Sequence, residues 1–178
     1  MSSFVQSALH VAHNVATSWL AHEEIKPNGT VPSVEVKEDQ ADKSAPLKLV
    51  GKNILVGVPG AFTTPCNSHI PPYIENYQEF KAKGVKHIYV IAVNDAFVMK
   101  AWKQHLAPEG TPIQFISDDK AALVSALGLV FDATDLLGGP RAKRFAIVTD
   151  DDRVVSVAVE QEPPKVTVTS AKSVLASL

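Results

Sequence analysis

The sequence predicts an α/β sandwich, with a central mixed β-sheet flanked by helices. Two continuous apolar runs, 53–58 and 87–93, are typical of strands buried on both faces, and a helical pattern follows each of them. Two further apolar runs, 145–149 and 153–159, are joined by the acidic turn 150–152, which predicts an antiparallel hairpin. Parallel strands followed by a hairpin make the sheet mixed, and a length of 178 residues suits one domain.

The chain before the sheet divides into two parts. Residues 1–26 carry apolar side chains at helical spacing, and we expect an N-terminal helical extension that packs on this domain or on a partner subunit. Secretory and mitochondrial leaders carry positive charge early, whereas the first Lys or Arg here is Lys26, so neither leader fits well. A degenerate or trimmed leader is the second interpretation. Residues 27–46 are rich in proline and charge, which predicts a linker with a short strand over 33–37, and 47–178 is then the domain itself.

The elements of that domain follow in a regular order. The expected ranges are strand 53–58, helix 67–83, strand 87–93, helix 95–105, strand 113–117, helix 120–127, an irregular stretch over 129–140, strands 145–149 and 153–159, and helix 170–177. Gly84 ends the first helix, and Pro71 is tolerated only near its first turns or at a kink. Asn94 or Asp95 is expected to cap the second helix, and Ser170 the last one.

Composition excludes several classes of protein. A net charge of −2 lacks the basic footprint of a nucleic-acid-binding protein. No apolar run is long enough to cross a bilayer as a helix. A single cysteine excludes an internal disulfide and a multi-cysteine zinc site, and the six histidines show no ligand pattern. We therefore expect neither a metal nor another cofactor, and the lone cysteine indicates a reducing compartment.

The single cysteine, Cys66, lies between the end of strand 53–58 and the start of a helix, where α/β folds place reactive groups. In a first helical turn, unpaired backbone N–H groups and the positive end of the helix dipole favour the nucleophilic thiolate. Thr63, three residues earlier, can donate a hydrogen bond to the sulfur or to a bound oxygen, or simply cap the helix. Pro59 and Pro65 stiffen the loop and remove backbone donors. The alternative is a buried cysteine that packs as a small apolar side chain.

These residues resemble a known family. Pro-Gly-Ala-Phe-Thr-Thr-Pro-Cys at 59–66 is similar to the peroxiredoxin active-site motif, a proline and a threonine or serine at fixed distances before a cysteine. The segments 69–71, 93–98 and 144–146, together with Trp102, resemble the Prx5 branch, also called atypical or type II. The resemblance extends from about residue 33 to residue 178. It implies a thioredoxin-like fold and a thiol-dependent peroxidase that reduces hydrogen peroxide and alkyl hydroperoxides without a cofactor.

The resemblance also implies a set of site residues. Cys66, Thr63 and Arg144 would meet in one pocket, where Arg144 would favour the thiolate and hold the peroxide oxygens through its N–H groups. Arg141 and Lys143 are interpreted as ordinary surface cations. The residues expected to shape the pocket are Pro59, Gly60, Phe62 and Pro65. The apolar stretch 136–139 resembles a loop near the family's pocket and would favour alkyl hydroperoxides.

The resemblance further implies partners. Attack on a peroxide would leave a sulfenic acid on Cys66, and the chain has no second cysteine to resolve it. An external thiol is therefore expected as reductant, either glutathione with glutaredoxin or thioredoxin. Proteins of this branch commonly form a homodimer through loops around the site, and 60–63 and 96–97 would lie there.

His69 departs from the family pattern. Only Asn67 and Ser68 separate Cys66 from His69, whereas family members usually have three intervening residues. One missing residue rotates a continuous helix by about 100°. We therefore expect His69 to be a structural or pocket-rim histidine and assign it no catalytic role.

Other functions and locations stay open at this point. A redox sensor or binding module on a thioredoxin-like fold would also carry an oxidisable cysteine. A cysteine hydrolase would pair Cys66 with a histidine, but no motif supplies that histidine. We expect the cytosol, with the mitochondrion or peroxisome as alternatives, because the final residues 176–178 resemble a peroxisomal tripeptide without its basic middle residue.

Overall fold

The computed structural model describes residues 22–178. The helical extension expected over residues 1–26 therefore falls outside the described residues, apart from 22–26, which are not helical. In the described part of the chain, no helix combines the length and apolar character needed to span a membrane.

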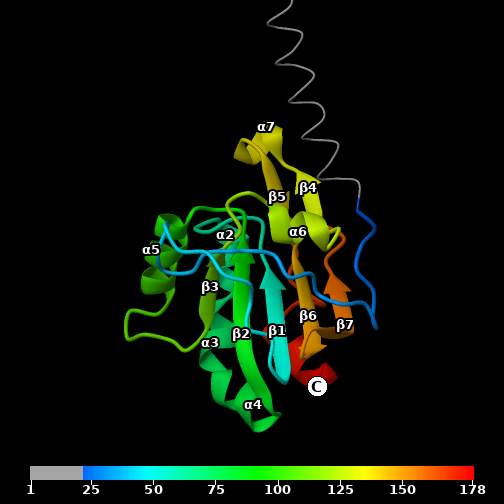
Figure 1. Cartoon of the computed structure of the whole chain (residues 1–178). Helices are drawn as coiled ribbons and strands as arrows, with labels where there is room; N and C mark the ends of the chain where they lie inside the picture. The colour runs from blue at the N-terminus through cyan, green and yellow to red at the C-terminus, as the bar shows by residue number, and fades with distance from the viewer. Residues whose placement is uncertain (1–21) are drawn as a thin grey trace, which may run out of the picture.

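The described residues form a mixed five-stranded sheet in the order β3-β2-β1-β6-β7 (Figure 1). The strands are β1 (Lys52–Gly57), β2 (Val85–Ala92), β3 (Gln114–Ser117), β6 (Phe145–Asp150) and β7 (Arg153–Val159). The first three pair in parallel, while β6 pairs antiparallel with both β1 and β7. The predicted mixed sheet and the hairpin at the acidic turn are both confirmed.

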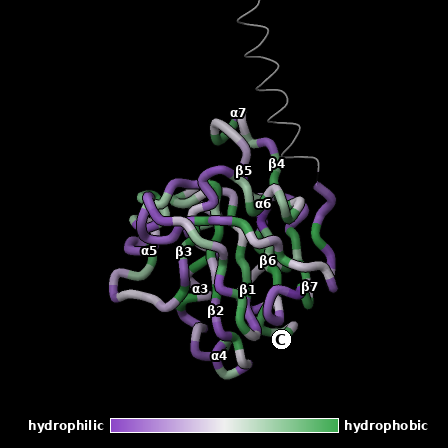
Figure 2. The backbone as a smooth tube through the Cα atoms, in the orientation of Figure 1, coloured by the Kyte–Doolittle hydropathy of each residue, from purple (hydrophilic) through white to green (hydrophobic). Residues whose placement is uncertain are grey.

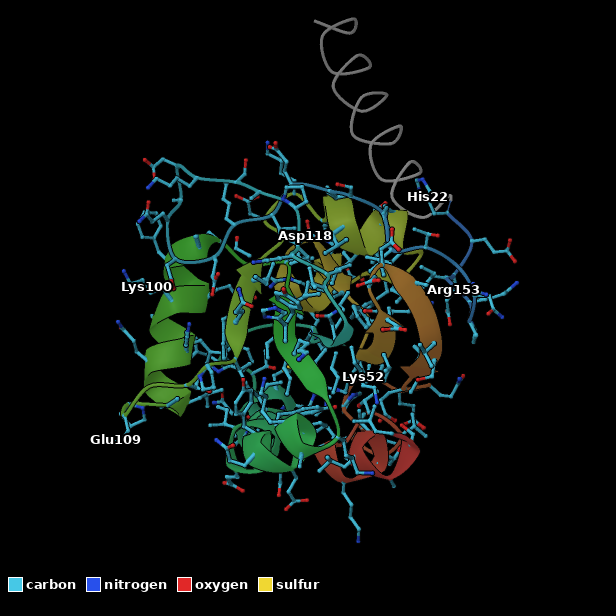
Figure 3. All side chains as sticks on the ribbon, turned by 60° about the horizontal axis from the view of Figure 1, so that its bottom comes forward. His22, Lys52, Lys100, Glu109, Asp118 and Arg153 are labelled. Carbon is cyan, nitrogen blue, oxygen red and sulfur yellow. The ribbon has the colours of Figure 1, made fainter. Side chains whose placement is uncertain are left out.

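The helices cover the sheet on both faces. They are α2 (Thr64–His69), α3 (Pro71–Glu75), α4 (Tyr77–Ala82), α5 (Ala96–Leu106), α6 (Ala122–Ala126), α7 (Thr134–Leu137) and α8 (Ala171–Ser177). Figure 3 shows α5, which carries Lys100, at one side of the sheet and β7, which carries Arg153, at the other. The predicted helix caps are confirmed. Asp95 accepts a hydrogen bond from the Val98 N–H (2.9 Å), and Ser170 accepts one from the Ser173 N–H (3.2 Å).

Alternation along the strands separates two apolar cores. Ile54 and Val56 of β1 face the helices from α2 to α5 and α8. Leu55 between them faces α6 and the N-terminal segment, residues 22–51. The apolar colouring of the central strands in Figure 2 follows from this double burial. The same alternation puts Ala146 and Val148 of β6 in the first core.

The single helix predicted over 67–83 is wrong, because three short helices occupy this stretch. The break lies at Ile70, which ends α2 and precedes two prolines. Pro71 and Pro72 have no N–H to donate to the preceding turn, so the helix cannot continue through them. At the second break the Asn76 side chain donates to the carbonyl of Pro72 (2.7 Å).

The stretch 129–140 is more regular than predicted. It contains β4 (Val130–Asp132) and α7, and the chain then returns through β5 (Pro140–Ala142), antiparallel to β4. Figure 1 shows this unit beyond the ends of β1 and β2. Elements of three or four residues are too short for a hydrophobic period to show in the sequence.

The N-terminal segment packs on the domain. Val31 and Val36 are buried in the second core. The strand expected over 33–37 is replaced by isolated bridges, in which Val36 pairs with Ala45 and Lys37 with Ser117.

The pairing of β1 with β6 positions the site. Gly57, the last residue of β1, lies opposite Phe145, the first residue of β6. A Cβ atom on Gly57 would lie 2.1 Å from the Phe145 ring, so only glycine allows this close approach. Because the strands are antiparallel, the chain that leaves β1 towards Cys66 lies beside the chain that enters β6 from Arg144.

Candidate active site

Cys66 is the third residue of α2 and is fully buried. At this position the backbone N–H has no partner within the helix. Thr63 precedes the helix in an extended conformation, and its hydroxyl donates to the Gly60 carbonyl oxygen (3.0 Å). The loop is tied to the end of β2 by a hydrogen bond from the Ala61 N–H to Asn94 Oδ1 (3.0 Å). The start of α2 is therefore held from two directions.

Arg144 reaches Cys66 from the entrance of β6. It is 1% exposed, and its Nη2 lies 3.4 Å from Cys66 Sγ. Its Nε donates to the Pro163 carbonyl oxygen (2.8 Å), and its Nη1 lies 3.0 Å from His69 Nδ1. The guanidinium is thus fixed on three sides, and one N–H group points at the sulfur.

His69 is buried between Arg144 and the chain before α8. Its Nε2 lies 2.8 Å from the Thr169 carbonyl oxygen. A carbonyl only accepts, so Nε2 carries the proton and Nδ1 is left to accept from Arg144. Burial is the main cause that lowers the pKa of His69 to about 4; the bond to Thr169 and the charge of Glu160 oppose this shift, and the charge of Arg144 adds to it. His69 is therefore neutral at physiological pH.

The contact between His69 and Arg144 was not predicted from the sequence. His69 is buried, which agrees with the expectation of a structural histidine. It is not a pocket-rim residue, because it does not line the cavity that is described below. Residues three apart on a helix share one face, and Cys66 and His69 have this spacing. That spacing is the signal that could have placed the two side chains together.

A cavity of about 540 Å³ opens beside Cys66. Thr63 and Arg144 line it together with Pro59 and Pro65. The rest of its wall comes from 131–137, which includes α7, and from Pro163 and Pro164. Cys66 does not line the cavity, so a molecule inside it meets Thr63 and Arg144 before the sulfur.

The other expected pocket residues lie further out. Gly60 accepts the Thr63 hydrogen bond but does not line the cavity. Phe62 is 46% exposed, has a left-handed backbone (φ 62°) and lies against the His105 ring at 5.5 Å between centroids. Of the apolar loop 136–139, Leu136 and Leu137 line the cavity. Among residues 22–178, no three potential metal ligands lie together.

Comparison with known proteins identifies similar chains. The family model described as Redoxin matches residues 23–175. The chain is 44% identical to peroxisomal membrane associated protein 20 of Schizosaccharomyces pombe over 150 residues, which cover 84% of this chain and 96% of that protein. It is 38% identical to peroxiredoxin-2B of Arabidopsis thaliana over 157 residues, which cover 87% and 96% of the two chains.

A solved structure is also similar. Reduced Prx3 of Vibrio vulnificus, in complex with hydrogen peroxide, has a TM-score of 0.78 and 37% sequence identity to this chain. The match covers 86% of this chain and 99% of the Vibrio chain.

The low pKa of His69 predicts a pH-dependent stability. The pKa is about 4 in the folded protein and near 6.5 in the unfolded chain, so the folded state favours the neutral ring. This stabilisation is complete above pH 6.5 and is lost as the pH falls from 6.5 through 4, by about 3 kcal/mol in total. The variant His69→Asn lacks this titration. Between pH 6.5 and pH 4 its free energy of unfolding should therefore fall by about 3 kcal/mol less than that of the wild type.

Urea unfolding at a series of pH values from 7 to 4 measures the difference. The variant His22→Asn, at an exposed histidine, is the control and should decline as the wild type does. A decline in His69→Asn as steep as that of the wild type would contradict the role of His69.

Proposed function

Because the chain belongs to the peroxiredoxin family, with its thioredoxin-like fold, and is a thiol-dependent peroxidase, we propose that Cys66 attacks the peroxide and that Thr63 and Arg144 are its catalytic partners. The observation that carries this proposal is the contact of 3.4 Å between Arg144 Nη2 and Cys66 Sγ. It joins the buried sulfur to the wall of the cavity in which a peroxide can bind.

Arg144 serves two purposes in the proposed reaction. Its positive charge favours a thiolate on the neighbouring Cys66. Its N–H groups can donate to the peroxide oxygens at positions fixed by Pro163 and His69. Donors fixed before the reaction stabilise the charge that develops on the departing oxygen without having to reorganise.

Thr63 orients the peroxide. Its hydroxyl proton is used in the bond to the Gly60 carbonyl, so its oxygen is left to accept a hydrogen bond from the peroxide O–H. The Cys66 thiolate then forms a bond to the terminal oxygen while the O–O bond breaks. The electron pair of that bond leaves with the second oxygen, which takes up a proton and departs as an alcohol or water. Cys66 is oxidised to a sulfenic acid.

Regeneration needs two equivalents of an external thiol. The first attacks the sulfenic sulfur, releases water and forms a mixed disulfide with Cys66. The second attacks that disulfide, leaves as part of an external disulfide and returns Cys66 as a thiol. We propose glutathione with glutaredoxin, or thioredoxin, as the source, because the chain has no second cysteine.

The rival functions have less support. The relatives favour a peroxidase over a redox sensor without turnover. A hydrolase needs a histidine that can take the proton of Cys66. His69 does not meet this requirement, because one ring nitrogen faces Thr169 and the other faces Arg144.

Peroxide kinetics test the proposed residues. Cys66→Ser should abolish the reaction, because the nucleophile is gone. Arg144→Ala should lower the second-order rate constant by about 10²–10³, the typical loss for one fixed donor to a developing charge. Thr63→Val should also slow the reaction, because valine cannot accept from the peroxide. Stopped-flow measurement with hydrogen peroxide and cumene hydroperoxide follows the reaction of the reduced protein.

Lys143→Ala is the matched control, since Lys143 is adjacent to Arg144 but pairs with Glu24, and its rate should equal that of the wild type. An unchanged rate in Arg144→Ala would remove Arg144 from the site. Turnover assays with glutathione and glutaredoxin, and separately with thioredoxin, identify the reductant.

We further propose that the chain forms a homodimer through the loops beside the site. Phe97, at the start of α5, is 74% exposed, and Phe62 is 46% exposed on the loop before α2. Large exposed aromatic side chains near a functional site are typical of a protein contact.

The variant Phe97→Glu should therefore dissociate the dimer, because a charge replaces an apolar contact. Sedimentation velocity of the wild type at micromolar concentration should give a dimer, and the variant a monomer. Val50→Glu changes an equally apolar residue, 56% exposed, outside the loops and should remain dimeric. A monomeric wild type, or a dimeric Phe97→Glu variant, would overturn this proposal.

We propose the cytosol as the location, with the peroxisome and the mitochondrion as alternatives. The peroxisome is supported by the name of the Schizosaccharomyces relative, a peroxisomal membrane associated protein. Antibody staining of the unmodified chain, imaged beside markers for both organelles, should give a diffuse signal. Staining that coincides with either marker would replace the cytosol by that organelle.

A further inference from the structure

Glu160 is a buried carboxylate that the proposed reaction does not use. It is 8% exposed and follows β7. Its Oε1 accepts from the Thr167 N–H (2.6 Å) and from the N–H and hydroxyl of Thr169 (both 2.9 Å). Its Oε2 accepts from the Thr167 hydroxyl (2.7 Å). Burial opposes the charged form, but these hydrogen bonds outweigh it and lower the pKa of Glu160, so the carboxylate is ionised at neutral pH.

These bonds close residues 160–169 into a loop, which we call the active-site strap. Its first residue is tied to the chain just before β6, because the Glu160 N–H donates to the Arg144 carbonyl oxygen (2.9 Å). Its last residues are tied to its first by the Glu160 carboxylate. One side chain therefore holds both ends of the strap together.

The strap contacts the site at two points. The Pro163 carbonyl accepts from Arg144 Nε (2.8 Å), and the same proline lines the cavity. The Thr169 carbonyl accepts from His69 Nε2 (2.8 Å) and from the Tyr73 hydroxyl (2.6 Å). Two of the three contacts of Arg144 thus depend on the strap, one directly and one through His69.

The Thr169 carbonyl and the Arg144 guanidinium together decide which nitrogen of His69 carries the proton. With the carbonyl in place, Nε2 donates and Nδ1 accepts from Arg144. If the carbonyl moved away, the neutral ring could carry its proton on Nδ1 instead. An N–H group would then face an N–H group of Arg144, and the guanidinium would lose its position against Cys66.

We propose that Glu160 is a positioning residue for the peroxidase reaction: through the strap it sets the His69 tautomer whose Nδ1 holds Arg144 against Cys66. This inference rests on the proposed function for its use of Arg144 and Cys66. Its step from Glu160 to His69 can be measured without any activity.

Two variants of Glu160 separate its geometry from its charge. Glu160→Ala removes the four acceptor contacts and should lower the rate constant with hydrogen peroxide by about tenfold to hundredfold, as expected for a displaced catalytic group. Glu160→Gln keeps an acceptor for the two backbone N–H groups, and the Thr167 hydroxyl can turn to accept from the new amide. It should therefore retain a rate within about threefold of the wild type, because hydrogen bonds rather than charge hold the strap. Glu162→Ala is the control, since Glu162 lies in the strap but is exposed and pairs with Lys165 at the surface.

Nitrogen-15 spectra of the imidazole groups give the second measurement, with the His69 signals assigned by their loss in His69→Asn. The wild type, Glu160→Gln and Glu162→Ala should show the Nε2–H tautomer, and Glu160→Ala a shift towards the Nδ1–H form. If Glu160→Ala does not fold, Thr169→Val replaces it. This variant removes one hydroxyl donor to the Glu160 carboxylate. It should give a smaller loss of rate and a partial shift of His69 towards the Nδ1–H tautomer.

The two measurements together decide the proposal. A loss of rate with an unchanged tautomer, a changed tautomer with an unchanged rate, or no change in either would overturn it. A wild type that does not consume peroxide would instead refute the proposed function, and the tautomer would still show whether Glu160 controls His69.

Discussion

The structure of the candidate active site depends on one constraint. The buried guanidinium of Arg144 needs hydrogen-bond partners on every side. An unpaired charge inside a protein is strongly destabilising. Within the described part of the chain, no carboxylate pairs with Arg144, and its partners are a carbonyl oxygen, a neutral imidazole nitrogen and the Cys66 sulfur. Of these three partners the sulfur is the proposed nucleophile, so the interaction that completes the burial of Arg144 also holds its charge beside the reacting atom.

The sheet and the strap meet this constraint from opposite sides. The antiparallel pairing of β1 with β6 carries Arg144 to the loop before Cys66, and Gly57 permits this pairing by leaving space for the Phe145 ring. The strap then covers the guanidinium and supplies the Pro163 carbonyl. A cation held in this way has little freedom to turn towards solvent, which suits a donor that must already be in place when a peroxide enters.

The cavity offers the peroxide of the proposed reaction a place to bind beside this closed site. Its wall combines the polar side chains of Thr63 and Arg144 with prolines and the apolar residues of 131–137. A peroxide oxygen and an apolar chain can therefore be accommodated on different parts of one wall. The short helix α7 forms part of that wall, so the stretch interpreted as irregular in the sequence has a direct part in the site.

The sequence alone was sufficient for the features that depend on local pattern. Apolar runs located the strands of the sheet, the strand-to-helix turn marked Cys66, and the family motif singled out Thr63 and Arg144. The solitary cysteine also predicted an external thiol as the reductant. These features are carried by neighbouring residues, or by a motif that the chain retains.

Only the tertiary structure decided the surroundings of Arg144. Cys66 and His69 lie in the same helix, α2, and their spacing places them on one face, but no spacing rule links His69 to a carbonyl 100 positions later. Glu160 likewise carried no signal, because its partners are backbone and hydroxyl groups brought together by the return of the chain after β7. Contacts between a side chain and a distant backbone leave no period or motif in a sequence, and they exist only once the sheet has brought the two segments together.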